Sequence, residues 1–178
     1  GGASLSIPLW AMVLIGLAGV MIFVLGMLYG DRLERAILKR HFWPVVLSCF
    51  VGSLVSMLLV QVLCRLFQAE ASLLNSLLPK SVTTAIAVSI AESSGGLPAL
   101  TAASVIITGI EGAMLAPLFA KVFHVTDPVV EGVAIGACSH AVGTSKALEI
   151  GPLQGAMSSI ALCVCGIITS ILAMFFTA

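Results

Sequence analysis

Long runs of apolar residues constrain this chain more than any other feature of its sequence. Residues 7–29, 45–67, 97–119 and 155–176 are each apolar over about the length that a helix needs to cross a bilayer, roughly 20 residues. Only 9% of the residues are charged, whereas a soluble domain carries about 25%. The runs also lack the alternation of apolar and polar residues that marks the strands of a membrane barrel. The sequence therefore predicts an all-α integral membrane protein.

Two further apolar stretches carry polar interruptions near their middle. Residues 73–90 are interrupted at 79–81, and residues 129–148 at 139–143. An unwound backbone is tolerated in hydrocarbon only where protein buries it or it lines a wet cavity. A pair of such interruptions is typical of transporters built with discontinuous helices. We therefore predict a polytopic helical bundle of six membrane-embedded segments, two of them broken helices.

The regions around the two interruptions show a weak internal sequence similarity. The composition allows either a chance match or a true repeat, and it favours neither a parallel nor an inverted arrangement of the two halves. We treat residues 1–178 as one domain with a motif-rich transport core at about 72–178. A shift of sixty residues aligns Val82 with Val142, Thr84 with Thr144, Ala87 with Ala147, Ile90 with Ile150 and Gly95 with Gly155.

The charges bear on partners and orientation. Eight Lys and Arg balance eight Asp and Glu, and no basic stripe exists, so we expect no nucleic-acid partner. Four of the basic residues lie within 31–41. We predict that this segment is a loop on the cytoplasmic or stromal side, followed by a helix with Pro44 in its first turn. A solvated linker without topological weight is the alternative.

The remaining polar residues show no catalytic or metal-binding spacing. The five cysteines lack CxxC or Cys/His spacing, so we interpret them as small packing residues. The nucleophile elbow, phosphate loop and HExxH motifs are absent from the sequence. We therefore predict no catalytic residue, no metal, no cofactor and no enzymatic activity. The chain begins with Gly1 rather than Met, which indicates a processed, truncated or tagged product.

The first interruption has the chemistry of an anion site. A helix that begins at Pro79 leaves its first amides free as donors, and such a helix end attracts anions. Lys80 adds a positive charge, and helical spacing puts it on one face with two threonines. The alternative is that Lys80 snorkels to an interface while the hydroxyls bond back to the helix. The expected amide donors are Ser81, Val82 and Thr83, and the substrate-binding candidates are Lys80, Ser81, Thr83 and Thr84.

The second interruption offers Ser139, His140, Gly143 and Thr144 as further substrate-binding candidates. Gly143 permits a close backbone approach, and amides from Thr144 onward would form a second helix end that faces the anion. If the segment is helical, His140 and Thr144 face one cavity. His140 titrates near neutrality, so it could couple transport to a proton, or it could simply form a hydrogen bond between helices.

Three other charged residues lie within apolar surroundings. Lys146 and Glu149 are three residues apart, which favours an internal ion pair but also allows substrate contact or proton coupling. Glu111 stands in the middle of an apolar run, either as a functional carboxylate or with a partner. Nearby small residues favour close helix packing, which predicts a homo-oligomer unless the same face packs within one subunit. These residues are Gly109, Gly112, Ala113 and Ala116.

These motifs in combination resemble the LrgB/CidB family of membrane proteins. The resemblance covers about residues 77–175 and rests on the segments 78–84, 95–96, 139–149 and 155–159. It implies an integral protein of a bacterial inner membrane or a plastid inner envelope. Family members usually have additional N-terminal membrane sequence, so we expect this chain to be N-terminally incomplete relative to the family. The family includes partners of holin-like LrgA/CidA proteins, linked to murein hydrolase control and carboxylate movement, and the plastidial glycolate/glycerate translocator. The sequence departs from the family pattern at Ala85, Glu111 and Lys146.

Residue chemistry and resemblance together predict a carrier of a small monocarboxylate such as glycolate, glycerate or pyruvate. The alternative is a holin-like protein that regulates murein hydrolase activity and permeability through oligomeric assembly. The expected partners are a small carboxylate substrate, the lipid bilayer, further copies of the chain and an LrgA/CidA-like membrane protein.

Overall fold

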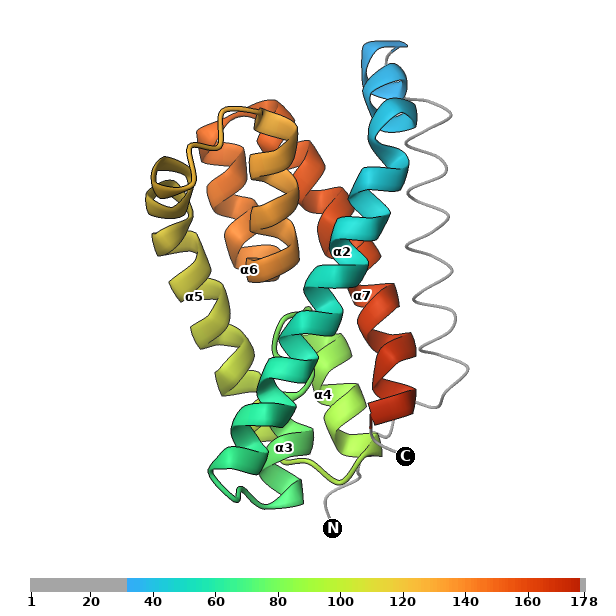
Figure 1. Ribbon diagram of the computed structural model, residues 1–178, viewed down its shortest axis with the longest axis vertical. Helices are drawn as coiled ribbons and strands as arrows, with labels where there is room; N and C mark the ends of the chain where they lie inside the picture. The colour runs from blue at the N-terminus through green and yellow to red at the C-terminus, as the bar shows by residue number, and fades with distance from the viewer. Residues whose placement is uncertain (1–31, 177–178) are drawn as a thin grey trace.

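The computed structural model describes residues 32–176, and their side chains from residue 40 onward. Within this range the chain is all-α, which confirms the predicted class (Figure 1). The predicted membrane segment at 7–29 lies outside the described residues. The helices are α2 (Arg32–Leu66), α3 (Ala71–Leu77), α4 (Thr84–Ser93), α5 (Pro98–Val122), α6 (Pro128–Ile150) and α7 (Pro152–Phe176).

Three of the described helices are long and apolar enough to cross a membrane. These spans are Arg40–Leu66, Pro98–Val122 and Pro152–Phe176. α5 begins with Pro98 at its first position and α7 with Pro152, where the missing amide proton of proline costs nothing. The chain is therefore an integral membrane protein, whereas six embedded segments and an internal repeat stay predictions.

The N-terminal part of α2 differs from the prediction. The charged segment is helical from Arg32 rather than a loop, and Pro44 lies inside α2 rather than in its first turn. Residues 32–40 are mostly Leu, Arg, Glu, Ala and Lys, which have high helix propensity. The helix therefore extends outward past the proline, which interrupts only one backbone hydrogen bond of a long helix. The side of the membrane on which this segment lies stays a prediction.

Both predicted interruptions are places where the chain reverses. α3 and α4 are joined by the non-helical residues 78–83, and we call residues 71–93 the first hairpin. The side-chain amide of Asn75 donates to the Ser94 carbonyl at 2.6 Å, which links the last turn of α3 to the C-terminal end of α4. In Figure 1 this hairpin occupies the lower half of the molecule.

The second reversal occurs inside α6, at His140. Its backbone is non-helical (φ 40°, ψ −137°), and residues 128–139 and 141–150 lie side by side in the upper half of Figure 1. A Cβ at Gly143 would lie 3.1 Å from the Ile135 side chain, a proximity that a straight helix does not allow. We call residues 128–150 the second hairpin.

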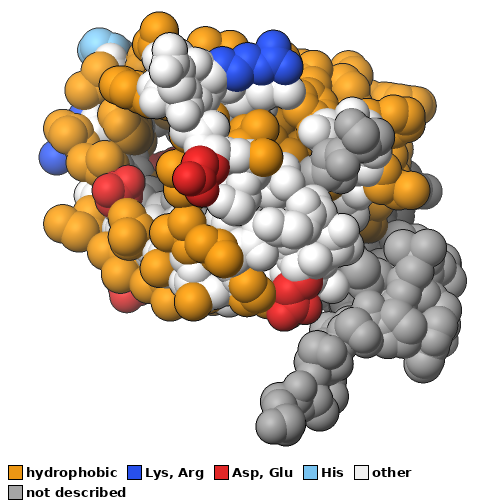
Figure 2. Space-filling model, turned by 90° about the horizontal axis from the view of Figure 1, so that it is seen from below, with side chains coloured by type: hydrophobic (Ala, Val, Ile, Leu, Met, Phe, Trp, Pro, Cys, Tyr) orange, Lys and Arg blue, Asp and Glu red, His pale blue; other side chains and the backbone are white. Residues whose placement is uncertain are grey.

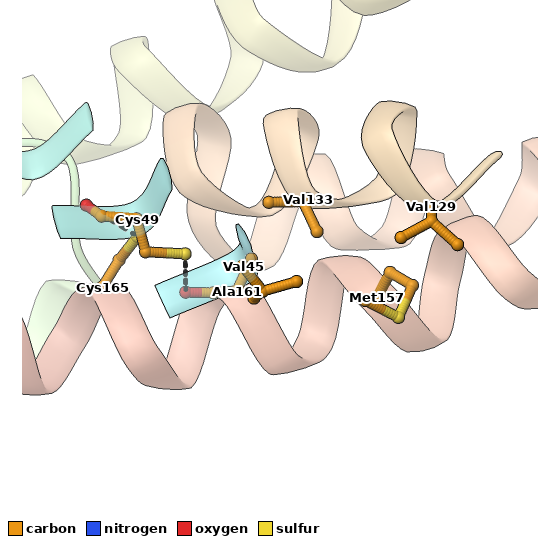
Figure 3. Close-up of a cluster of buried hydrophobic side chains, with 7 residues drawn as sticks. All are labelled: Val45, Cys49, Val129, Val133, Met157, Ala161 and Cys165. Atoms are coloured by element: carbon orange, nitrogen blue, oxygen red, sulfur yellow. Dashed lines mark hydrogen bonds between the residues drawn. The ribbon is translucent and has the colours of Figure 1, made fainter. Parts of the chain in front are cut away.

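The core is formed where α2, α6 and α7 pack together (Figure 3). Gly132 and Gly136 of α6 lie directly against the backbone of Gln154 and Ser158 in α7, where a Cβ would overlap backbone atoms. Cys49 is fully buried, and its thiol lies 3.9 Å from the Ala161 carbonyl oxygen. The packing interpretation of the cysteines thus fits the buried ones, Cys49, Cys64 and Cys165, whereas Cys138 and Cys163 are exposed. The cluster comprises Val45, Cys49, Val129, Val133, Met157, Ala161 and Cys165.

Much of the surface is apolar, as a lipid-facing surface requires. Large hydrophobic side chains such as Val55, Leu59, Ile107 and Met114 are exposed on α2 and α5. Viewed end-on, hydrophobic side chains extend around much of the rim, while acidic side chains appear on the end face (Figure 2).

Candidate functional site

The two hairpin tips converge on one residue of α5, Val105. Val82, in the tip of the first hairpin, packs with Ala87 against the fully buried Val105 side chain. His140, at the tip of the second hairpin, forms a hydrogen bond of 2.8 Å between its Nε2 and the Val105 carbonyl oxygen. The two predicted interruptions, about sixty residues apart in sequence, therefore meet near the middle of the molecule.

The backbone of the first tip differs from the prediction. The Lys80 amide donates to the Leu77 carbonyl at 3.2 Å and the Val82 amide to the Pro79 carbonyl at 3.3 Å, so the chain forms turns here rather than a helix. Thr83 is the N-cap of α4, with extended backbone. The helix end therefore lies after the predicted position, and its free amides belong to residues 84–86 instead of residues 81–83.

The side chains of the first tip do not share one helical face. Lys80 precedes α4, so the helical spacing that would align it with the threonines does not apply. Ser81 forms a 2.7 Å hydrogen bond with Ser56 of α2, Thr83 is half-buried and Thr84 is exposed. Lys80 itself is half-buried. Among the described residues its ammonium has no carboxylate partner.

The second tip is a compact polar cluster. Ser139, His140 and Thr144 are buried, with only 1%, 3% and 9% of their surfaces exposed. The Thr144 hydroxyl donates to the His140 carbonyl at 2.9 Å and lies 2.9 Å from the Ser158 hydroxyl of α7. Helical structure resumes at residue 141, so the predicted amide donors from Thr144 onward lie inside the helix. His140 takes the predicted alternative of a hydrogen bond between helices.

Two glycines explain how α5 approaches this tip. A Cβ at Gly109 would lie 2.9 Å from the His140 Nε2, and a Cβ at Gly112 would overlap the Ser139 hydroxyl. Gly109 and Gly112, two of the small residues named above, thus pack within the subunit. This packing is the predicted alternative to a homo-oligomer contact. The homo-oligomer is not tested by this contact. Gly143 likewise contacts Ser139 within the hairpin.

The other charged candidates lie away from this meeting point. Lys146 and Glu149 form an ion pair of 2.8 Å between Nζ and Oε2, with 37% and 68% of their side chains exposed. Glu111 is exposed on α5. Among the described residues, no group of three or more His, Cys, Asp or Glu side chains is arranged to hold a metal ion.

Sequence reasoning did not identify Val105 or Ser56 as parts of the site. Val105 acts through its carbonyl oxygen and its small apolar side chain, which no residue-type signal reveals. Ser56 appeared only as one small residue in a spanning helix, and its role depends on the contact with Ser81.

Comparisons with known proteins identify related sequences. The model of the LrgB-like family matches residues 10–178. The chain is 37% identical over 139 residues to the antiholin-like protein LrgB of Bacillus mycoides (strain KBAB4) and to those of Bacillus cereus (strain B4264) and Bacillus anthracis (strain CDC 684 / NRRL 3495). The match covers 78% of this chain but 60% of each relative's length. No solved structure matches the chain.

The family match extends over nearly the whole sequence, including both hairpins and the helices that pack against them. The chain therefore belongs to the LrgB-like family.

Proposed function

We propose that this chain is an antiholin-like membrane protein that controls membrane permeability, and with it murein hydrolase activity, by assembling with other membrane chains. The name of its relatives, antiholin-like protein LrgB, supports this function. The membrane is a bacterial inner membrane or a plastid inner envelope, as the family resemblance implies.

Glu111 is the observation that carries this proposal. It lies near the middle of α5, a helix of spanning length, and its side chain is exposed. Ile107, Ile110 and Met114 around it are exposed apolar residues, and no described residue pairs with the carboxylate. A charged side chain at the bilayer centre costs about 2.5–3.5 kcal/mol on insertion scales. A neighbouring chain that donates a hydrogen bond to Glu111 offsets this cost and fixes where the chains meet.

The test compares Glu111→Leu with Met114→Leu, a matched change on the same exposed face. Both variants are reconstituted in lipid nanodiscs for mass measurement, and in vesicles for leakage of solutes of graded size. Glu111→Leu is expected to lower the mass of the assembly and change the size-graded leakage, while Met114→Leu changes neither. An assembly that is unchanged in Glu111→Leu, or a strictly monomeric wild-type protein, contradicts the proposal.

A second candidate function, the transport of a small monocarboxylate, is favoured by a different observation. Lys80 is a half-buried cation in the first hairpin tip, with no carboxylate partner among the described residues. A charged residue inside a membrane protein usually pairs with another charge or lies on a substrate path. A bound carboxylate supplies the missing partner, with Ser81, Thr83 and the α4 amides as further donors.

Flux measurements separate the two functions. Vesicles that contain the protein are loaded with glycolate, D- and L-glycerate, pyruvate or neutral dyes of graded size. Saturable and stereoselective carboxylate uptake supports the carrier. Leakage that depends only on solute size supports the antiholin-like function and excludes the carrier.

A further inference from the structure

The lengths of the hairpin helices decide how far they reach into the membrane. α3 has 7 residues and α4 has 10, which correspond to about 10 and 15 Å of helix. Residues 128–139 and 141–150 correspond to about 18 and 15 Å. The hydrocarbon core is about 30 Å thick. α4 and both arms of the second hairpin are therefore about half as long as the hydrocarbon core is thick, α3 is about a third as long, and none of these helices is long enough to cross it.

Both tips lie where an interrupted helix is tolerated. Non-helical backbone at membrane depth must be buried in protein or line a wet cavity. Val82 and Leu78 of the first tip are 1% and 2% exposed, and Ser139 and His140 of the second are 1% and 3% exposed. Each tip packs against or bonds to Val105 of α5.

The two hairpins belong to units of the same construction. Each is followed by a 25-residue helix that begins with a proline, α5 in the first unit and α7 in the second. In the first unit, Ser76 contacts the chain just before α5, where its hydroxyl accepts a 2.7 Å hydrogen bond from the Leu97 amide. In the second unit, Gly136, sixty positions after Ser76, contacts the Ser158 backbone near the start of α7.

The two units point in opposite directions. α5 ascends in Figure 1 whereas α7 descends, and the hairpins enter from the lower and upper ends respectively. The sixty-residue shift that aligns the two halves of the sequence also aligns Lys80 with His140, so each tip carries one basic residue. Inverted units of this kind let one site at their contact be reached from either face of the membrane.

We propose that residues 71–122 and 128–176 form an inverted repeat, in which two re-entrant hairpins enter from opposite membrane faces and act as the two gates of one mid-membrane site at Val105. Movement of the first hairpin opens the site to one face, and movement of the second opens it to the other. This arrangement holds for either candidate function.

Sided labelling tests the architecture. Glu70→Cys, Glu92→Cys, Thr126→Cys and Glu149→Cys are made singly in a background without the native cysteines, and an impermeant maleimide is added to sealed vesicles. Residues 70 and 92 are expected to be labelled to the same extent from outside the vesicles, and so are residues 126 and 149. Because the two pairs lie on opposite faces, the labelled fraction of the first pair and that of the second pair add up to complete labelling. If residues 70 and 92, or residues 126 and 149, label from opposite faces, that hairpin crosses the membrane and the proposal is wrong.

Tethering tests the gates without any assumption about the solute. Cys138 is retained as the reporter, because it is exposed and lies two residues before His140 of the second tip. The pairs Ser56→Cys/Ser81→Cys and Thr144→Cys/Ser158→Cys, whose hydroxyl oxygens lie 2.7 and 2.9 Å apart, are oxidised with copper phenanthroline to lock one tip at a time. The matching single-cysteine variants, oxidised in the same way, are the controls.

A small hydrophilic thiol reagent then probes Cys138 from each face. The untethered protein is expected to react from both faces. Locking the first tip should leave reaction only from the face where residues 126 and 149 lie, and locking the second tip only from the face of residues 70 and 92. Reaction that is unaltered by either tether, or a reporter that never reacts in the untethered protein, overturns the gates even where the labelling confirms the architecture.

Discussion

The two hairpins reach the same residue of α5 but are held there in different ways. The first turns through six non-helical residues, is linked to α2 by the Ser56–Ser81 hydrogen bond, and carries a lysine with no described carboxylate partner. The second turns at His140 alone, and its polar side chains bond to α5, to α7 and to its own backbone. The polar side chains of the second tip thus make their hydrogen bonds within the protein. The first tip instead carries a charged side chain without a described carboxylate partner.

This difference separates binding from stability. A side chain whose hydrogen bonds are all made within the protein adds to folding stability, and its removal leaves a buried partner unsatisfied. A cation without a partner adds little to folding but is available to a ligand. We therefore expect substitutions at the first tip to alter the affinity for a carboxylate ligand. Substitutions at the second tip should instead alter the free energy of unfolding.

The largest effect is expected from Lys80→Met. This change removes the ammonium but keeps most of the apolar stem, so the protein should fold with almost unchanged thermal stability. Loss of a charge-assisted hydrogen bond costs about 1.5–3 kcal/mol, or roughly ten- to a hundredfold in carboxylate affinity. Calorimetric titration with glycolate, glycerate and pyruvate measures the carboxylate affinity. Lys121→Met, at the exposed end of α5, is the control. Wild-type affinity in Lys80→Met would show that the lysine snorkels and binds no anion.

Gly136→Ala should destabilise the second hairpin. The new Cβ meets the Ser158 backbone in α7, which cannot rotate away, and such overpacking costs about 1–3 kcal/mol. Gly96→Ala beside the first hairpin should cost less, because its closest neighbour would lie 2.9 Å away. Thermal unfolding in detergent compares both with Gly52→Ala, where the Cβ has no neighbour within 4 Å. An equal loss at Gly52 would show that helix effects, rather than the contact, determine stability.

His140→Phe should lower stability by about 1–3 kcal/mol, because the buried Val105 carbonyl loses its partner. His41→Phe, at a half-buried position in α2, is the matched control. Unfolding is followed by circular dichroism in detergent, and carboxylate titration is repeated on the folded variant. A variant of wild-type stability that has lost carboxylate binding would move His140 from the structural role to the binding role.

Ser81→Ala is expected to have the smallest effect, about 0.5–1.5 kcal/mol, because it removes one half-buried hydrogen bond to Ser56. Ser56→Ala should cost a similar amount, and the double variant should cost less than the sum of the two, since both single changes break the same bond. Thermal unfolding of the three variants completes the cycle. Additive losses would show that the two hydroxyls act independently.

Hydropathy and helix signals predicted much of this fold. The apolar runs indicated the spanning parts of α2, α5 and α7, and Pro98 marked the start of α5. The polar interruptions include residues whose backbone is non-helical, 79–81 and His140, but hydropathy has no direction, so it could not show that the chain reverses there. The same scale could not reveal that good helix formers extend α2 outward past Pro44.

The candidate site was predictable as a set of residues but not as a geometry. Lys80, His140 and Thr144 were chosen because polar side chains are costly in apolar segments. Their partners are a backbone carbonyl at Val105 and hydroxyls on other helices, and these contacts depend on which faces meet. Helical spacing predicted that Lys80 and Thr84 share one helical face. Two turns, at Leu77 and Pro79, instead make α4 begin only at Thr84, so Lys80 lies outside the helix.

The distance between the two tips tests the central claim most directly. Spin labels at Lys80→Cys and at the retained Cys138 are compared, by pulsed electron spin resonance in nanodiscs, with labels at Glu92→Cys and Glu149→Cys near the hairpin bases. The tip pair should give a short distance, and the base pair a distance near the hydrocarbon thickness of about 30 Å. A tip pair as far apart as the base pair would contradict the meeting of the two hairpins at Val105.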